Sequence, residues 1–196
     1  MVLYLSIIIV ANIIISALNI IFGTAIFGYS AWAVILMVAG TTVFQFAIDG
    51  LFAIIVKCFP DKWFAVDNKH FFVTKKTQKF YEKFGIKKWK DKVWELGGLG
   101  GFRKNKFNDP SDPEYIKRFI IESNKGIVTH RIGYFVGFLG VFLFPLKYAL
   151  VIGIPVAFVN LFLNILPTMV LKYNIPRLHT ALKRSERQLA LKNDAH

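Results

Sequence analysis

The sequence predicts an all-α fold: a polytopic helical membrane protein with about four transmembrane helices and a helical segment at the membrane surface between the second and the third. The first observation is that apolar residues, 55% of the 196, are gathered in long blocks instead of the short periodic groups of a soluble core. Blocks 2–22, 31–56 and 133–171 contain, in that order, no charged residue, Asp49 alone and Lys147 alone. The second observation is that basic residues are gathered between and after these blocks. A hydrocarbon core of about 30 Å takes about 20 helical residues, so the blocks are long enough to span it.

The block at 2–22 is expected to be a retained span rather than a secretory signal peptide. It lacks a positive n-region, its apolar run exceeds a normal h-region, and no small-x-small cleavage site precedes Gly23. Asn12, Ser16 and Asn19 follow the i, i+4, i+7 pattern and therefore share one helical face. Lipid cannot satisfy these polar groups, so that face is predicted to turn inward.

The second span, 31–56, carries a similar polar stripe of Thr42, Gln45 and Asp49. Burying an acidic side chain within a bilayer is costly, and such residues usually serve a function or form half of a buried pair. Both interpretations of Asp49 remain open from the sequence.

The third span is shorter, because only twelve residues, 133–144, precede Pro145. Extending it back so that His130 and Arg131 lie at the headgroup level makes it long enough to cross. The alternative is a kinked re-entrant hairpin, and both versions return the chain to the same side of the membrane.

Small and polar residues in the last two spans predict close helix packing. Gly133, Gly137 and Gly140 allow close approach of a neighbouring helix in the third span. Asn160 and Asn164, four residues apart in the last span, lie on one helical face.

The distribution of positive charge predicts the orientation. Of 25 Lys and Arg residues, 18 lie within 57–131 and six follow Leu171. Since positive residues are retained in the cytoplasm, both termini and the central segment are expected in the cytosol, in a multi-pass protein of the cell membrane. The expected segments are an N-terminal hairpin, a basic membrane-surface segment, a C-terminal hairpin and a basic tail, at 1–57, 58–131, 132–172 and 173–196.

The net charge of +13 does not point to nucleic acid, because no recognised reading motif accompanies it. Topology explains the charge, and so does attraction to anionic lipid, worth about 1 kcal/mol per basic residue near the surface. The lipid bilayer is the expected partner. The single Cys58 excludes an intrachain disulfide, and the scattered histidines predict no metal site; no cofactor is expected.

The central segment is predicted to begin with a short helix that has Thr74 as N-cap and Gly85 just past its end. A second helix is expected to follow, with Trp89, Val93 and Leu96 on one face and lysines opposite. Such a helix either lies in the membrane interface or packs on its neighbours. The Gly-Gly-Leu-Gly-Gly run after it lacks the Gly-Lys-Ser/Thr of a phosphate loop.

A third helix is predicted to begin at Asp112, a good N-cap, with Pro113 in the first position. If Gly126 does not break it, Glu122 and His130 lie about two turns apart on neighbouring faces. A general base there could deprotonate a hydroxyl at the membrane surface. The alternatives are a solvated helix-end charge and an interfacial anchor.

The last span ends in "LKYNIPRL", where Tyr173 is expected at the interface and Asn174 and Pro176 are expected to stop the helix. Arg177 then suits a carboxylate or a phosphate, or is a basic anchor that reaches the headgroups.

These motifs, taken in order, resemble one family. They are a Trp-Lys pair in a basic aromatic helix, an Ile-Glu-Ser followed by His eight residues after the Glu, and a terminal Asn…Tyr-Asn-x-Pro-Arg-Leu. Together they resemble the glycosyl-4,4'-diaponeurosporenoate acyltransferase family of the staphyloxanthin carotenoid pathway, over about residues 79–182. The matching positions are Trp89, Lys90, Glu95, Glu122, His130, Asn164, Tyr173, Asn174, Pro176 and Arg177.

The resemblance implies transfer of a fatty acyl group to a sugar hydroxyl of a glycosylated lipid at the cytosolic membrane face, with an acyl donor such as acyl-CoA as co-substrate. We assign His130 as the catalytic base, oriented by Glu122 or Glu95. The expected substrate-binding residues are Trp89, Lys90, Asn164, Tyr173, Asn174 and Arg177, of which Lys90 and Arg177 hold donor phosphates. The rival hypotheses are a non-catalytic scaffold or anionic-lipid-binding accessory subunit, and an acyltransferase for a different glycolipid. The oligomeric state is not predicted.

Overall fold

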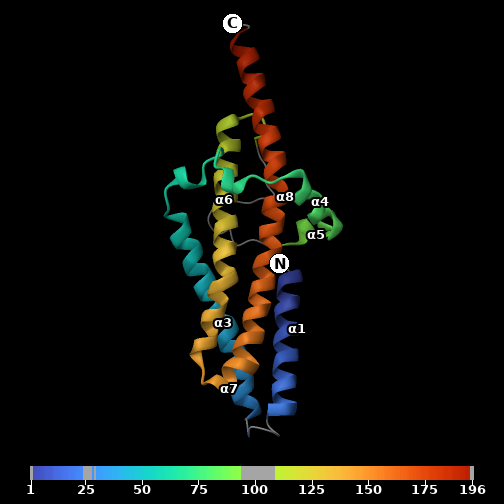
Figure 1. The fold of residues 1–196 in the computed structure, drawn as a ribbon, viewed down its shortest axis with the longest axis vertical. Helices are drawn as coiled ribbons and strands as arrows, with labels where there is room; N and C mark the ends of the chain where they lie inside the picture. The colour runs from blue at the N-terminus through green and yellow to red at the C-terminus, as the bar shows by residue number, and fades with distance from the viewer. Residues whose placement is uncertain (1, 24–27, 29, 94–108, 195–196) are drawn as a thin grey trace. The chain divides into compact units, whose positions relative to one another are not determined.

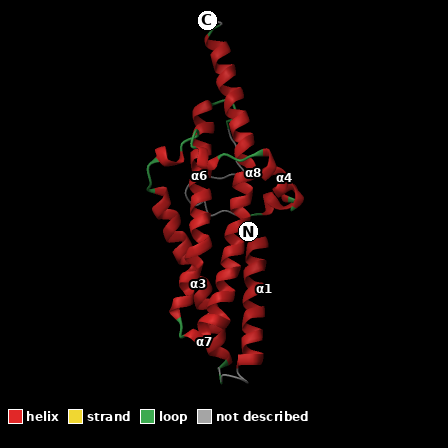
Figure 2. Cartoon of the chain, in the orientation of Figure 1, coloured by secondary structure: helices red, strands yellow, loops and turns green. Residues whose placement is uncertain are grey.

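The computed structural model describes residues 2–23, 28, 30–93 and 109–194. Throughout these ranges the chain consists of helices joined by loops and turns, without a strand (Figures 1 and 2). The expectation of an all-α fold is therefore confirmed.

Seven α-helices and several shorter 3-10 and π segments make up the described chain. The α-helices are α1 (Val2–Leu18), α3 (Ala31–Lys57), α4 (Lys75–Lys83), α5 (Ile86–Trp89), α6 (Pro113–Val136), α7 (Leu146–Tyr148) and α8 (Ile154–Asn193). The shorter segments are η1 (Asn19–Gly23), η2 (Asp61–Phe64), η3 (Lys69–Phe71), η4 (Lys90–Lys92), η6 (Gly137–Leu143) and η7 (Ala149–Gly153).

Four helical stretches of the described chain are long and apolar enough to cross a membrane, as the sequence predicts. They are Leu3–Gly23, Ala31–Lys57, Pro113–Leu143 and Leu146–Asn193. The third stretch joins α6 to η6 without interruption at Gly126 and ends just before Pro145. These are the features of a membrane protein.

The chain forms two compact units. Unit 1 consists of residues 1–55 and 129–166, and unit 2 of residues 56–128 and 167–196. Helices α3, α6 and α8 each contribute residues to both units. The sequence-based division at 57, 131 and 172 stays a prediction.

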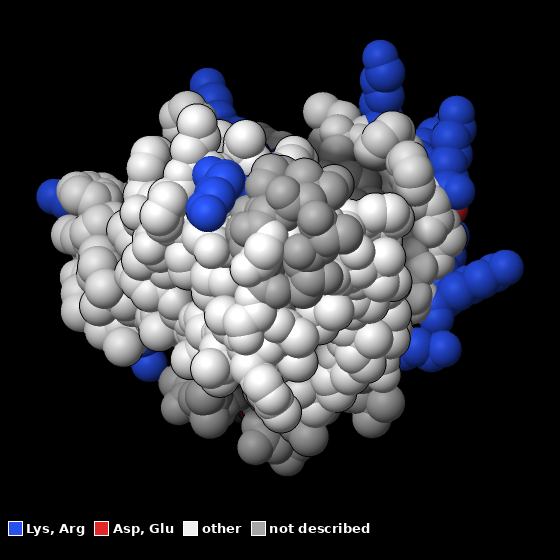
Figure 3. Space-filling view, turned by 90° about the horizontal axis from the view of Figure 1, so that it is seen from below, with Lys and Arg blue, Asp and Glu red and all other residues white. Residues whose placement is uncertain are grey.

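Unit 1 is a set of helices lying side by side, α1 and α3 with the end of α6 and the start of α8 (Figure 1). Its core is aliphatic and consists of Ile15, Val34, Val38, Ile152 and Val156. Many of its large apolar side chains are exposed, among them Ile13, Leu36, Val43, Phe135 and Phe142. In the end view of Figure 3, uncharged residues make up most of the described surface. An apolar exterior of this extent is typical of a surface that faces lipid.

Polar side chains of the first span turn inward in unit 1, as predicted, and one of them bonds to the second span. Asn19 Nδ2 donates to the carbonyl oxygens of Ile15 and Val151, both at 2.9 Å. Thr42 Oγ1 donates to Asn12 Oδ1 at 3.0 Å and so joins α3 to α1. These bonds satisfy groups that lipid would leave unpaired.

Local capping signals hold in unit 2. Thr74 Oγ1 accepts from the Thr77 N–H at 3.2 Å and begins α4. Gly85 follows the end of α4 with a φ of 66°, a left-handed conformation that glycine adopts without strain. Asp112 Oδ1 accepts from the Glu114 N–H at 2.9 Å at the start of α6. All three predictions of helix ends are confirmed.

The expected helix through Val93 and Leu96 is shorter than predicted. After α5 the chain tightens into η4, and Val93 is already extended, with a ψ of 123°. The side chain of Val93 is 2% exposed, so its burial accompanies the departure from helical geometry. Leu96 lies outside the described residues.

The prediction that Asn174 and Pro176 stop the last helix is wrong, because α8 continues to Asn193 with Pro176 inside it. A proline in a helix interior costs about 3 kcal/mol. Packing on either side compensates: Ile175, Leu178 and Leu182 are buried. Burial of such side chains is worth about 1.5–3 kcal/mol each, more than the proline costs.

A buried lysine fixes the segment after α3 to α6 within unit 2. Lys125 is 7% exposed, and its Nζ lies 2.6 Å from Asp61 Oδ1 and 3.3 Å from the Lys57 carbonyl oxygen. Asn124 Nδ2 donates to the Phe64 carbonyl oxygen at 2.9 Å. The hydrogen bond from Lys125 lowers the pKa of the Asp61 carboxyl, so this carboxyl stays charged beside the lysine.

Candidate functional site

A cluster of polar side chains from three helices lies in unit 1. His130 comes from α6, Asn164 from α8 and Asp49 from α3. Asn164 Oδ1 lies 2.9 Å from His130 Nδ1, and Asn164 Nδ2 donates to Asp49 Oδ2, also at 2.9 Å. The amide of Asn164 therefore stands between an imidazole and a carboxylate.

The surroundings of Asn164 determine which way its amide points. Its Nδ2 faces three oxygen acceptors: Asp49 Oδ2, the Asn160 carbonyl oxygen at 3.1 Å and Asn160 Oδ1 at 3.4 Å. The reverse orientation would direct the amide oxygen at these oxygens, which is repulsive. Oδ1 therefore faces His130 and accepts from Nδ1–H, so the neutral imidazole carries its lone pair on Nε2.

Two glycines of the third span make room for the asparagines of α8. A Cβ on Gly133 would lie 2.6 Å from Asn164 Oδ1 and 2.8 Å from its Nδ2. A Cβ on Gly137 would lie 2.5 Å from Asn160 Nδ2. Real Cβ atoms do not approach this closely, so the close helix approach predicted from these glycines is present.

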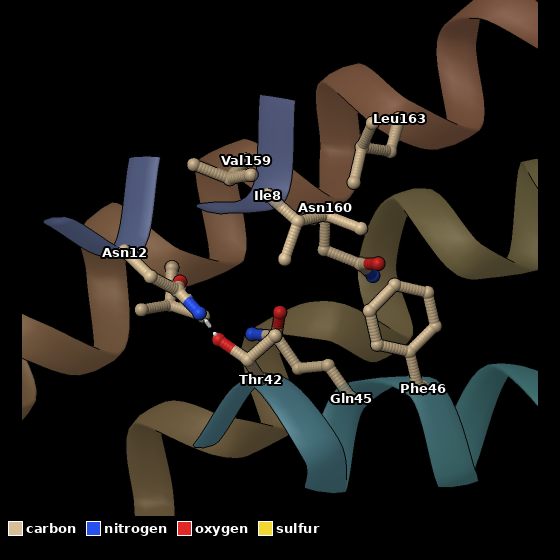
Figure 4. Close-up of a pocket in the computed structure, with 9 residues that line it drawn as sticks. Ile8, Asn12, Thr42, Gln45, Phe46, Val159, Asn160 and Leu163 are labelled. Atoms are coloured by element: carbon tan, nitrogen blue, oxygen red, sulfur yellow. Dashed lines mark hydrogen bonds between the residues drawn. The ribbon is translucent and has the colours of Figure 1, made fainter. Parts of the chain in front are cut away.

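A recess lined by both polar and apolar side chains lies beside the cluster in unit 1 (Figure 4). It is a small, open recess, and the 230 Å³ of empty space around it includes the part open to the surroundings. The lining residues are Ile8, Asn12, Thr42, Gln45, Phe46, Val156, Val159, Asn160 and Leu163. Asn160 belongs to both features, because its Oδ1 lies 3.4 Å from Asn164 Nδ2.

A second cluster lies in unit 2, where Tyr173 of α8 joins Arg177 to Glu82 of α4. Tyr173 is 1% exposed, and its hydroxyl donates to Glu82 Oε1 at 2.9 Å. Arg177 Nη2 donates to the same hydroxyl at 3.2 Å, and the guanidinium lies 4.9 Å from the centre of the Tyr173 ring. Stacking on a buried ring holds the exposed guanidinium in one orientation.

The charged groups of this cluster stabilise one another's ionised forms. The hydrogen bond from Lys87, at 2.8 Å, lowers the pKa of the Glu82 carboxyl, and the Tyr173 hydroxyl lowers it further. In return, the same bond raises the pKa of the Lys87 ammonium. Both groups are therefore charged at neutral pH and form an ion pair at the carboxylate oxygen that accepts from the Tyr173 hydroxyl.

The remaining predicted site residues have local partners in unit 2. Trp89 Nε1 donates to the Phe84 carbonyl oxygen at 3.0 Å. Lys90 Nζ lies 2.8 Å from Asp91 Oδ1. Asn174 is half-buried on α8.

Of the two predicted catalytic carboxylates, Glu122 lies within the described residues. Glu122 lies on α6 eight residues before His130, and its Oε1 lies 3.4 Å from Arg118 Nε. Glu95 lies outside the described residues. The structure thus joins His130 to Asn164, and Tyr173 to Arg177, and gives Glu122 a partner of its own.

Two residues of these clusters were not among the predicted site residues. Asp49 had a clear signal, as the lone charge in an apolar span, but nothing in the sequence linked it to Asn164. Glu82 had no signal in the sequence, because an acidic residue in a lysine-rich surface helix is indistinguishable from an ordinary solvent-exposed charge. Its contact with Tyr173 joins residues 91 positions apart.

The comparisons with known proteins give a family. Residues 60–184 match the family model CrtO, described as glycosyl-4,4'-diaponeurosporenoate acyltransferase. No curated protein and no solved structure matches the chain. The matched range contains His130, Asn164 and the cluster around Tyr173, whereas Asp49 precedes it.

Proposed function

Because the chain belongs to the glycosyl-4,4'-diaponeurosporenoate acyltransferase family, we propose that it transfers a fatty acyl group to a sugar hydroxyl of a glycosylated lipid. The observation that carries the chemistry is the pair of His130 and Asn164, 2.9 Å apart. A histidine whose ring is oriented by a hydrogen bond to one nitrogen is suited to move a proton with the other.

In the proposed reaction, Nε2 of His130 accepts the proton of the sugar hydroxyl while the hydroxyl oxygen attacks the acyl carbonyl. With a thioester donor such as acyl-CoA, the new C–O bond replaces the C–S bond. The proton then passes from His130 to the departing thiolate. General base catalysis of this kind contributes about 10²–10⁴-fold to the rate.

The proposed binding roles belong to residues of unit 2. The exposed guanidinium of Arg177, stacked on Tyr173, has the planar donor geometry that suits a phosphate of the donor. Lys90 would bind a second phosphate, and Trp89 and Asn174 would contact the substrates. Glu122 or Glu95 would help to orient His130.

The proposed acceptor is a glycosylated carotenoid acid, which the family description names. A different glycolipid is the second candidate, since the sugar hydroxyl and the acyl donor would be the same. We further propose that the reaction takes place at the cytosolic face of the cell membrane, where the basic residues of the central segment are expected.

The test is acyl transfer by the purified, detergent-solubilised protein, supplied with acyl-CoA and a glucosylated lipid. Ester formation is expected, and His130→Ala is expected to lower kcat about 10²–10⁴-fold. His70→Ala, which changes an exposed histidine, is the matched control and should keep full activity.

The outcomes separate the hypotheses. No ester from the wild-type protein with either lipid would favour a scaffold or a lipid-binding subunit. Full activity in His130→Ala would show that His130 is not the base, although the protein would still be an acyltransferase.

A further inference from the structure

We propose that Asp49 is a positioning residue for the acyl transfer: through Asn164 it holds His130 in the Nδ1–H tautomer, so that Nε2 is the base. The proposal rests on the function proposed above. Asp49 lies outside the residues that match the family model, so the family match assigns it no role.

Asp49 and Asn164 are in direct contact, which is the first step in orienting His130. Asp49 Oδ2 accepts from Asn164 Nδ2 at 2.9 Å, a bond between α3 and α8. The oxygens of an ionised carboxylate accept hydrogen bonds and cannot donate them. Asp49 Oδ2 therefore requires an N–H from the amide of Asn164. Asp49 therefore selects one of the two amide orientations of Asn164.

The second step is the transmission to His130. With Nδ2 directed at Asp49, Asn164 presents Oδ1 to His130 Nδ1 at 2.9 Å. An oxygen acceptor requires Nδ1 to carry the hydrogen, which leaves the lone pair on Nε2. The other acceptors for Nδ2 are the carbonyl oxygen and Oδ1 of Asn160, at the longer distances of 3.1 and 3.4 Å and on the helix of Asn164 itself. Asp49 is thus the acceptor that comes from a different helix, α3.

The third step is the charge that develops during the reaction. When Nε2 takes a proton, His130 becomes a cation inside an apolar unit. The carboxylate of Asp49, one amide away, offsets that charge, and such interactions are stronger where water is excluded.

A fourth observation concerns the other oxygen of Asp49. Within the described residues, Asp49 Oδ1 is buried and has no hydrogen-bond partner. Leaving a buried carboxylate oxygen unsatisfied is costly, and such groups in native proteins call for an explanation. If Asp49 only joined two helices, an uncharged amide or hydroxyl would do so at a lower cost of burial. A negative charge is useful here because the nearby imidazole becomes positive when it takes a proton.

The experiment measures the tautomer directly. The protein labelled with 15N-histidine is purified in detergent, and the 15N shifts of His130 are recorded at a pH where its ring is neutral, with the resonance assigned from the spectrum of His130→Gln. The expected spectrum has Nδ1 as the protonated nitrogen. Nε2 as the protonated nitrogen in the wild-type protein would overturn the proposal without any variant at Asp49.

The variants then test the role of Asp49. Asp49→Asn is expected to give a mixture of tautomers, and to lower kcat about 10²-fold at an unchanged KM for the donor. Thr42→Val is the matched control, because Thr42 lies on the same stripe of α3 but bonds to Asn12, and it should keep the wild-type tautomer. Circular dichroism and elution volume confirm that each variant is folded.

Failure of this inference is distinct from failure of the proposed function. A wild-type tautomer in folded Asp49→Asn would overturn the role of Asp49, whatever the activity. Absence of acyl transfer in the wild-type protein would contradict the proposed reaction. The tautomer measurements would still decide whether Asp49 orients His130.

Discussion

At the residue scale, Asn164 is the side chain that joins three helices of unit 1. It contacts His130 on α6, Asp49 on α3 and Asn160 on its own helix. Its amide lies against Gly133, which has no side chain to occupy that space. The orientation of one amide thus depends on one glycine and one carboxylate.

Gly133→Ala should displace this amide. The added methyl group would lie 2.6 Å from Asn164 Oδ1, so the α6–α8 contact must open. We expect a loss of about 1–3 kcal/mol in the free energy of unfolding and a fall in kcat. Gly40→Ala is the control, because nothing lies within 4 Å of its added Cβ. Denaturant melts and initial rates measure the two effects, and equal behaviour of both variants would contradict the packing argument.

Arg177→Lys tests the guanidinium platform on Tyr173. A lysine retains the charge but cannot stack its head group on the ring or present two parallel donors. We expect KM for the acyl donor to rise about tenfold with little change in kcat. Arg184→Lys, an exposed position two turns further along α8, should leave both constants unchanged. An unaltered KM in Arg177→Lys would remove this residue from donor binding.

At the element scale, the ends of helices could be predicted from the sequence, but their partners could not. Thr74 and Asp112 act on backbone groups two or three residues away, so short-range chemistry identifies them. The passage of α8 through Pro176 depends on packing by Leu178 and Leu182, which a local rule about proline does not include. The contact of Asn164 with Asp49 spans 115 positions and follows no spacing pattern.

The bond between Glu82 and Tyr173 ties α4 to α8 and should depend on pH. The pKa of Glu82 is lowered from its usual 4.5 in the folded protein, so its contribution to stability is complete above that value. It is lost as the pH falls below 4.5 and through the folded pKa. Wild type should therefore melt at a higher temperature than Glu82→Gln at pH 7, and the two should converge in acid. A constant difference across this range would show that the ionised carboxylate is not what stabilises the contact.

At the scale of the whole molecule, hydropathy and charge predicted the number of spans, because length and composition decide whether a helix can cross a bilayer. They could not predict that residues 1–55 pack with 129–166 as one unit, because neither its aliphatic core nor bonds such as that from the Tyr4 hydroxyl to the Leu163 carbonyl oxygen follow a spacing pattern. Orientation across the membrane stays a prediction of the charge distribution.

Cys58 allows that orientation to be measured. It is the single cysteine of the chain, it is exposed, and it follows the end of α3 directly. We expect a membrane-impermeant maleimide to label it only after cells are opened. In a Cys58→Ser background, Ser30→Cys should be labelled on intact cells, because residue 30 is exposed in the connection expected outside. The opposite pattern would reverse the topology.

The position of Asp49 shows that the range matching the family model does not include every residue of the polar cluster. Residues 60–184 carry the match to the family, yet the carboxylate that faces Asn164 comes from the helix before them. A fragment cut at the limits of that match would keep His130 and Asn164 but lose the carboxylate that accepts from Asn164. On the mechanism proposed here its imidazole would be free to exchange tautomers, and the N-terminal hairpin would be needed for catalysis as well as for anchoring in the bilayer.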